Sequence, residues 1–312
     1  MQEFLQQFVN GLSVGAIYAL IAVGYTMVYG VLQLINFAHG DVFMVGAVLC
    51  LVLARAFGFV GPEGVTESWL AFGLVATLAV VGCGALGFLI ERLAYRPLRD
   101  KPRINSLITA IGISLLLEYG AQHPKMFGAT PQAFPVGLLG AGITKPLFTV
   151  AGVQVGRVDA LVLGVALGLM LALSYVVLRT KQGLALRAVS FRFDTAALMG
   201  ININRIISLT FVLGSVLAAV AGILYAVKYP KVEPLMGLFP GIKAFVAAVF
   251  GGIGNITGAV VAALLLGVIE TMVVGYLPGG SNYKEAVAFV VLIAILLVKP
   301  AGLFGRNVVE KV

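Results

Sequence analysis

Charge is scarce in this 312-residue sequence, since only 11% of its residues are Asp, Glu, Lys or Arg. Ordinary soluble domains carry about 25% of such residues, so the composition excludes a soluble globular protein. The first Lys or Arg is Arg55. Because no basic segment lies close to Met1, we expect no cleavable signal peptide.

Cysteine and histidine are nearly absent as well. Cys50 and Cys83 fall inside apolar runs without the spacing of metal ligands, so we expect neither a disulfide nor a metal site. No Ser/His/Asp set, paired carboxylates or Walker motif stands out, so we predict that the chain is not an enzyme and binds no cofactor itself. The net charge of +8 lies in loops between apolar runs and does not indicate nucleic-acid binding.

Apolar residues are abundant: they make up 60% of the chain, and the mean hydropathy is +1.05. A soluble core cannot absorb this much apolar surface. The 39 glycines suit a lipid environment, where small residues such as Gly11 and Gly15 let helices pack closely. The sequence therefore predicts an all-α polytopic integral membrane protein with one transmembrane domain, residues 1–312.

Long apolar runs predict roughly eight or nine transmembrane or broken helices. The run 239–255 is short for a span, because at about 1.5 Å per residue it barely crosses the hydrocarbon. We expect a broken or re-entrant helix there. The other expected spans are residues 8–30, 42–60, 69–93, 104–120, 159–178, 206–225, 257–277 and 285–298.

Basic residues concentrate in two loops, 92–103 and 179–205, which are separated by two expected spans. Both loops therefore lie on one side, which the positive-inside rule assigns to the cytoplasm. Counting along the chain places the N-terminus outside and the C-terminus in the cytoplasm. Lys228 and Lys231 fall on the external side and run against the rule.

The hydrophilic stretch 179–205 is too polar for lipid and too rich in helix formers for a plain turn. Ser190 or Asp194 is placed to cap a short helix, and Gly200 to end it. We interpret the stretch as a cytoplasmic helical loop that presents a surface to a partner. The alternative is a solvated loop that only obeys the positive-inside rule.

Asn36, His39 and Asp41 form a polar break inside apolar sequence, where each is costly unless it meets an interface or a watery cavity. The spacing of His39 and Asp41 allows a metal or proton site. The favoured interpretation is a tight cytoplasmic turn whose side chains cap the second span.

The segment 251–258 is rich in glycine and invites comparison with a phosphate-binding loop. Its spacing differs from that motif, no Lys-Ser or Lys-Thr follows, and no strand precedes it. We interpret the segment as a hinge between two helices, in which Gly254 and Gly258 allow close packing. The candidate hinge residues are Gly251, Gly252, Gly254 and Gly258.

Glu118, Asp159 and Glu270 lie in or at the ends of expected spans, and Glu270 is the deepest. Intramembrane carboxylates often face a substrate path, so Glu270 joins Asn36, His39 and Asp41 as a candidate pathway or gating residue. The alternative for Glu270 is a hydrogen bond to a neighbouring helix. An ion-coupled carrier usually has several such groups and inverted repeats, and neither is clear here.

The assembled motifs resemble the permease subunits of the branched-chain amino-acid type of ABC importer over nearly the whole chain. The resemblance implies a second related permease, two cytoplasmic ATP-binding subunits that hold ATP and Mg, and an external substrate-binding protein. It also implies multi-pass insertion in a bacterial or archaeal cytoplasmic (inner) membrane. The motifs that carry it are Gly11–Gly30, Ile35–Asp41, Glu91–Pro97, Ala196–Asn202, Ala248–Gly254 and Gly302–Gly305.

By the same resemblance, the stretch 179–205 contains a coupling helix that docks on an ATPase. Residues 194–200 are similar to the E-A-A-x-x-x-G pattern of importer coupling loops, with Asp194 in place of Glu. The usual following Pro is missing, and Phe191 and Arg192 stand where acidic or amide residues are more common. The implied coupling residues are Arg187, Arg192, Asp194, Ala196, Ala197 and Gly200.

Alternatives remain beside this importer prediction. A urea or short-amide importer shares the architecture, and a self-sufficient secondary carrier or channel would need no ATPase. Branched-chain or other hydrophobic amino acids are the substrates that the resemblance implies.

Overall fold

The computed structural model describes residues 1–312 except 35, 62–63, 100, 151 and 306–312. Helices dominate, because backbone groups in apolar surroundings must be hydrogen-bonded within their own segment. The helices are α1 (Gln2–Leu32), α2 (His39–Ala56), α3 (Trp69–Ile90), α4 (Arg103–Gln122), α5 (Arg157–Arg179), α6 (Lys181–Phe191), α7 (Phe193–Leu198), α8 (Ile203–Lys228), α9 (Leu238–Gly251), α10 (Ile256–Tyr276) and α11 (Gly280–Val298).

Eight helices of the described part are long and apolar enough to cross a membrane, and α9 is a shorter apolar helix. These nine agree with the predicted spans, including the short one. α11 begins five residues before its predicted start, at Gly280 rather than Glu285. α3 continues through a π-helical turn, η1 (Glu91–Tyr95), and a 3-10 turn, η2 (Arg96–Leu98).

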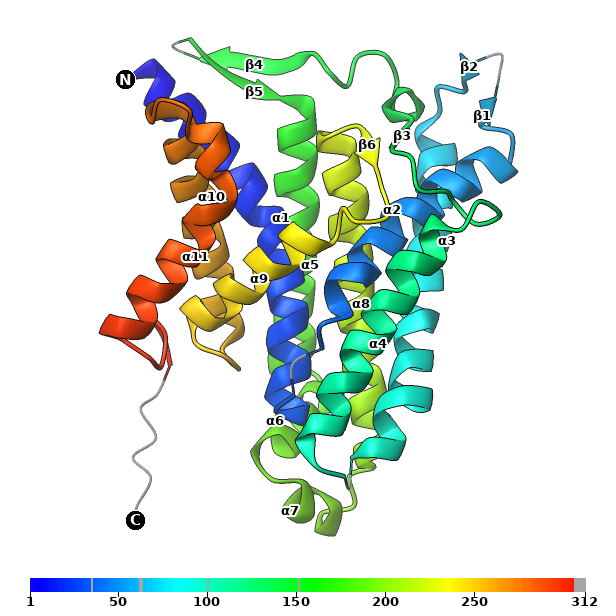
Figure 1. The fold of residues 1–312 in the computed structure, drawn as a ribbon, viewed down its shortest axis with the longest axis vertical. Helices are drawn as coiled ribbons and strands as arrows, with labels where there is room; N and C mark the ends of the chain where they lie inside the picture. Colours follow the sequence, from blue (N-terminus) through cyan, green and yellow to red (C-terminus); the bar gives the residue numbers. More distant parts are fainter. Residues whose placement is uncertain (35, 62–63, 100, 151, 306–312) are drawn as a thin grey trace.

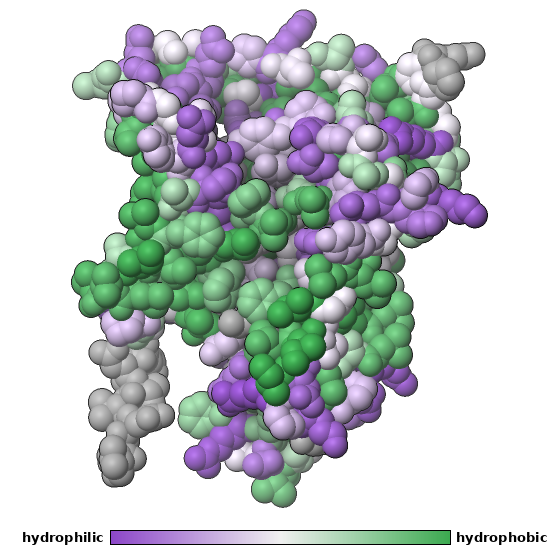
Figure 2. All heavy atoms as spheres, viewed as in Figure 1, coloured by the Kyte–Doolittle hydropathy of each residue, from purple (hydrophilic) through white to green (hydrophobic). Residues whose placement is uncertain are grey.

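α1 forms the centre of the bundle and packs against α10, α8, α9 and α5 (Figure 1). Of its most apolar window, 94% is buried, against 17% for α4 and 11% for α11, so the outer helices leave apolar side chains exposed. Hydrophobic side chains cover much of the middle of the face in view, and hydrophilic ones gather towards its two ends (Figure 2). This distribution suits a protein surrounded by lipid.

Gly11 and Gly15 allow the closest packing of α1, as their spacing predicted. A Cβ at Gly11 would lie 2.6 Å from the Cα of Val268, and one at Gly15 would lie 2.8 Å from the Cα of Leu264. Both neighbours belong to α10, so the two glycines bring the α1 and α10 backbones together.

Short strands lie at the end of the molecule where α1 begins (Figure 1). They form three antiparallel pairs, which the all-α prediction did not include: β1 (Val60–Gly61) with β2 (Gly64–Val65), β3 (Gln132–Ala133) with β6 (Lys231–Val232), and β4 (Pro146–Val150) with β5 (Val153–Gly156). A 3-10 turn, η3 (Val136–Leu139), lies between β3 and β4. The β5 strand is tied to α1 by two hydrogen bonds between Gln6 and the Gln154 backbone, of 2.8 and 3.0 Å.

α2 begins inside the bundle, part-way along α1. The His39 ring lies 4.7 Å from the ring of Tyr25, which is seven residues before the end of α1. The predicted cytoplasmic turn at residues 36–40 is therefore wrong in its placement, because the chain folds back into the interior before α2 starts. The predicted cap is wrong too: Ala38 is the N-cap residue, and no side chain among the described residues makes a capping hydrogen bond there.

α9 begins beside the start of α2. A Cβ at Gly40 would lie 2.9 Å from the carbonyl oxygen of Gly237, and one at Gly241 would lie 3.0 Å from the Cα of Gly40. Glycine is needed on both helices, because any side chain would separate the two backbones. The N-termini of α2 and α9 thus meet in the interior. Their free backbone N–H groups lie at membrane depth, which is tolerated because protein and not lipid surrounds them.

Candidate functional site

The stretch 179–205 folds into two helices, α6 and α7, at the end of the molecule opposite to the strands (Figure 1). Thr180 begins α6: its side chain accepts a hydrogen bond of 3.1 Å from the Gly183 backbone. The prediction of a single helix capped by Ser190 or Asp194 is wrong. The Ser190 hydroxyl donates back to the Arg187 carbonyl, and α7 has no side-chain cap at its start.

Gly200 ends α7, as predicted, in a left-handed conformation with φ +80°. Its N–H donates to the Ala197 carbonyl at 2.9 Å, and the Ile201 N–H donates to the Ala196 carbonyl at 3.1 Å. These two bonds form a Schellman motif, which favours glycine because other residues rarely adopt positive φ.

The surface of the α6–α7 unit is basic at its sides and apolar at its tip. Ala196 is buried and anchors α7 to the body, while Arg187, Arg192, Asp194 and Ala197 are exposed. The apolar tip, which was not predicted, is formed by the highly exposed side chains of Leu198 and Met199, and Phe191 at the end of α6 is highly exposed as well. Exposed apolar side chains gathered in this way mark an interaction surface.

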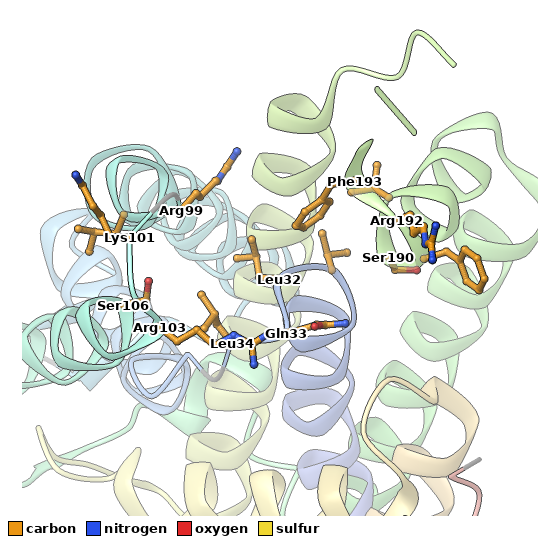
Figure 3. Close-up of a pocket in the computed structure, with 14 residues that line it drawn as sticks. Leu32, Gln33, Leu34, Arg99, Lys101, Arg103, Ser106, Ser190, Arg192 and Phe193 are labelled. Atoms are coloured by element: carbon orange, nitrogen blue, oxygen red, sulfur yellow. The ribbon is translucent and has the colours of Figure 1, made fainter. Parts of the chain in front are cut away.

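The two basic loops meet at this end, as the spacing of the spans predicted. Arg99 donates a hydrogen bond of 2.5 Å to Asn204, which joins the loop after α3 to the start of α8. A cavity of about 340 Å³ lies between the loops (Figure 3). Arg99, Lys101 and Arg103 line one side and Arg192 the other, so the cavity is strongly positive.

The predicted polar break is buried. Asn36 accepts a hydrogen bond of 2.9 Å from the Tyr95 hydroxyl. His39 Nε2 and Asp41 Oδ2 have no hydrogen-bond partner among the described residues, although both side chains are at most 3% exposed. Within the same part of the chain, no three His, Cys, Asp or Glu side chains come together as metal ligands.

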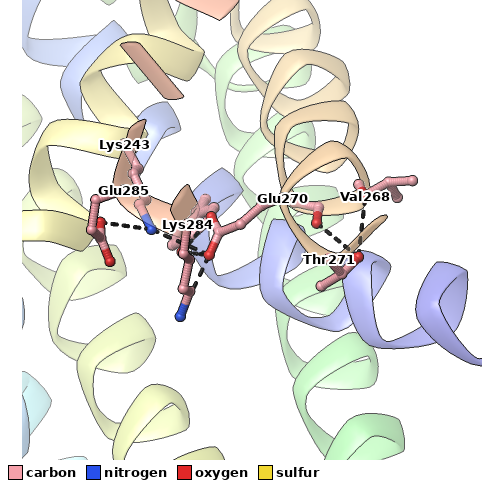
Figure 4. A network of polar contacts seen from close by, with 8 residues as sticks. Lys243, Val268, Glu270, Thr271, Lys284 and Glu285 are labelled. Carbon is pink, nitrogen blue, oxygen red and sulfur yellow. Dashed lines mark hydrogen bonds and ion pairs between the residues drawn. The ribbon is translucent and has the colours of Figure 1, made fainter. Parts of the chain in front are cut away.

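Glu270 lies in a buried network of charges (Figure 4). Its carboxylate accepts a hydrogen bond of 3.1 Å from the Tyr18 hydroxyl and lies 3.2 Å from Lys243 Nζ and 3.5 Å from Lys284 Nζ. Lys243 also pairs with Glu285 at 2.9 Å. The network connects α1, α9, α10 and α11 through Tyr18, Lys243, Glu270, Lys284 and Glu285. Among the described residues, these contacts do not bring Glu270 together with Asn36, His39 or Asp41, the other three residues of the site prediction.

The glycine segment joins α9 to α10, but the two glycines that pack closely are not the predicted pair, Gly254 and Gly258. Gly251 and Gly258 pack backbone against backbone, whereas a Cβ at Gly254 would meet nothing within 4 Å. Gly252 and Gly254 have positive φ, of +100° and +91°. The turn therefore needs glycine at Gly254 for conformation and at Gly258 for space, and its role as a hinge stays a prediction.

Several polar contacts inside the bundle were not predicted, because they join residues on different helices. Glu91 is fully buried, pairs with Arg99 and accepts a hydrogen bond from Ser208. Lys228, which runs against the positive-inside rule, pairs with Asp159 and donates to Ser13 at 3.1 Å. Lys231 is likewise paired, with Glu233 at 2.8 Å.

The sequence matches a protein family described as "Branched-chain amino acid transport system / permease component" over residues 7–296. It is 42% identical over 310 residues to the high-affinity branched-chain amino acid transport system permease protein BraD of Pseudomonas aeruginosa, covering 99% of this chain and 98% of BraD. It is 40% identical over 309 residues to LivH of Escherichia coli K12, a permease protein of the same description, with the same coverage. PsaBC from Streptococcus pneumoniae in complex with Fab is similar with a TM-score of 0.47 at 14% identity, covering 96% of this chain and 94% of that one.

Proposed function

This chain belongs to the permease family of branched-chain amino acid transport systems, and from that premise we propose that it forms half of the membrane channel of an ATP-driven importer. The transported substrates are branched-chain or other hydrophobic amino acids, as the names of the relatives suggest. The chain lies in a bacterial or archaeal cytoplasmic membrane with its N-terminus outside. It performs no covalent chemistry, since ATP and Mg are bound by partner subunits.

The observation that carries the proposal is the α6–α7 unit. It places an exposed apolar tip, Leu198 and Met199, beside basic side chains at the end where both basic loops lie. An apolar tip fits a groove on a rigid partner, and the basic rim favours an acidic surface around that groove. We assign this partner as a cytoplasmic ATPase, with Arg187, Arg192, Asp194, Ala197 and Gly200 on or beside the docking surface.

The remaining partners follow from the same premise. A second related permease completes the channel, a second ATPase docks on it, and an external binding protein delivers substrate to the end that carries the strands. ATP binding closes the ATPase pair and moves the α6–α7 units, which opens the channel to the outside. Hydrolysis resets the channel towards the cytoplasm.

ATP-driven uptake of labelled leucine into proteoliposomes that hold the chain with its partner subunits tests the proposal. Gly200→Pro places proline at φ +80° and removes the N–H that bonds Ala197, so it disrupts the end of α7. Gly58→Pro is the matched control, because Gly58 also has positive φ and donates to a helix carbonyl, that of Arg55, at the opposite end.

We expect uptake to require ATP, to collapse in Gly200→Pro and to persist in Gly58→Pro, with both variants inserted in the membrane. Uptake of urea but not leucine would redirect the substrate assignment to the short-amide importers. Uptake by the chain alone, driven by an ion gradient and indifferent to Gly200→Pro, would replace the importer with a secondary carrier.

A further inference from the structure

A cavity of about 180 Å³ lies in the interior where α2 and α9 begin. α1 contributes Tyr25, α4 contributes Ser114 and Glu118, and α2 contributes Asp41. The apolar part of the lining is formed by Phe37, Leu238, Ile242 and Phe245. The lining thus combines acidic and hydroxyl side chains with apolar ones.

Asp41 is the polar group that the fold leaves incomplete. Its side chain is only 3% exposed, it lines the cavity, and its Oδ2 atom accepts no hydrogen bond within the described residues. Ser114 and Glu118 are the polar neighbours that act on this carboxyl, and no Lys or Arg of the described residues lines the cavity. A buried carboxylate without a cation is costly, so a cationic group bound in the cavity would stabilise Asp41.

The lining excludes several kinds of ligand. A phosphate, or a carboxylate on a molecule that has no ammonium group, would be repelled by Asp41 and Glu118. A hydrated metal ion would leave Phe37, Ile242 and Phe245 against water without gain. A primary ammonium group on a short branched hydrocarbon matches both parts of the lining, because the ammonium has three donors for the carboxylates and the hydrocarbon contacts the apolar side chains.

We infer that this cavity is a transient subsite for the α-ammonium group and apolar side chain of an amino acid during its passage. Asp41 binds the ammonium group, Glu118 and Ser114 support it, and the cluster of Phe37, Leu238, Ile242 and Phe245 receives the side chain. The inference rests on the proposed importer function and adds a site within the permease to the recognition supplied by the external binding protein.

The test uses membrane vesicles that contain the assembled complex, washed free of the external binding protein. Leu238→Cys places a thiol at the cavity, where Leu238 is 44% exposed and therefore open to a reagent. Leu235→Cys is the matched control, since Leu235 is 50% exposed in the segment before α9 and does not line the cavity. The rate of modification by a thiol reagent is measured with leucine, 3-methylbutylamine or 4-methylpentanoate; the native Cys50 and Cys83 are buried.

We expect leucine and 3-methylbutylamine to slow modification at Leu238→Cys and not at Leu235→Cys. 4-Methylpentanoate, which has the same hydrocarbon without the ammonium group, gives no protection. Adding Asp41→Asn raises the leucine concentration for half-protection about tenfold or more. The reason is that the ion pair between the ammonium group and Asp41 becomes a hydrogen bond to an uncharged amide. Protection by 4-methylpentanoate, protection unchanged in Asp41→Asn, or protection by none of the three compounds would overturn the subsite.

The same vesicles separate this inference from the proposed function. ATP-driven leucine uptake without protection of Leu238→Cys would refute the subsite and leave the importer intact. Protection with uptake that ignores ATP would refute the importer and leave the subsite intact.

Discussion

Replacing Glu270 with glutamine tests how far the buried charge network stabilises the bundle. The Glu270 side chain is 2% exposed and lies near Lys243, Lys284 and the Tyr18 hydroxyl. Removing one partner of a buried ion pair costs about 3–5 kcal/mol. Since Lys243 keeps Glu285, we expect the lower value, and for a chain of this length the thermal midpoint falls by about 5 °C.

Glu285→Gln is the control, because Glu285 pairs with the same Lys243 but its side chain is 41% exposed. A partly solvated carboxylate contributes less than a fully buried one, so we expect the midpoint to fall less for Glu285→Gln than for Glu270→Gln. Adding Lys243→Met to Glu270→Gln recovers part of the loss, because both charges then leave the interior. The assay is thermal unfolding of the purified protein at one fixed heating rate. Equal shifts for Glu270→Gln and Glu285→Gln would refute the argument from burial.

Leu198→Asp lowers ATP-driven uptake and retention of the ATPase during purification without lowering the thermal midpoint, because Leu198 is 88% exposed at the α7 tip. Leu235→Asp, in the exposed segment between β6 and α9, leaves ATPase retention unchanged, and equal loss in both would count against docking through α7. Gly222→Ala destabilises the fold by about 1–3 kcal/mol in thermal unfolding, since its Cβ would overlap the Phe43 carbonyl oxygen. Gly73→Ala is the control and is tolerated, because its Cβ would meet no described atom within 4 Å. Similar midpoints for the two variants would contradict this packing.

The course of the spans was predictable because hydropathy and length alone decide which segments can cross lipid. The short α9 was predictable for the same reason, and Gly200 because a left-handed helix end favours glycine. These features depend on local sequence, and the predicted spans coincide with the helices, although α1 begins six residues and α11 five residues before the predicted starts.

The interior start of α2 was not predictable from the same signals. The sequence around Asn36, His39 and Asp41 is the same whether these side chains face water at a turn or contact other helices inside a bundle. The partner that decides the matter for Asn36 is Tyr95, 59 residues away in the chain. The pairing of Lys243 with Glu270 is hidden for the same reason, because only tertiary packing brings α9 to α10.

The α6–α7 unit was located correctly but divided wrongly. Thr180, just after α5 and upstream of the predicted caps Ser190 and Asp194, caps α6. The backbone is extended at Arg192, so two helices replace one. The apolar tip was overlooked because Leu198 and Met199 read as ordinary helix-core residues until their exposure is known.

The residues around the cavity differ in how much substitution they tolerate, because α2 and α9 touch through glycines. Gly40, Gly237 and Gly241 admit no larger residue, because the helices touch there through their backbones. Side chains such as Ile242 and Phe245 face open volume and are free to change in size. A related permease can therefore transport a different substrate by changing the apolar residues of the cavity, while the acidic residues and the glycines between α2 and α9 stay the same.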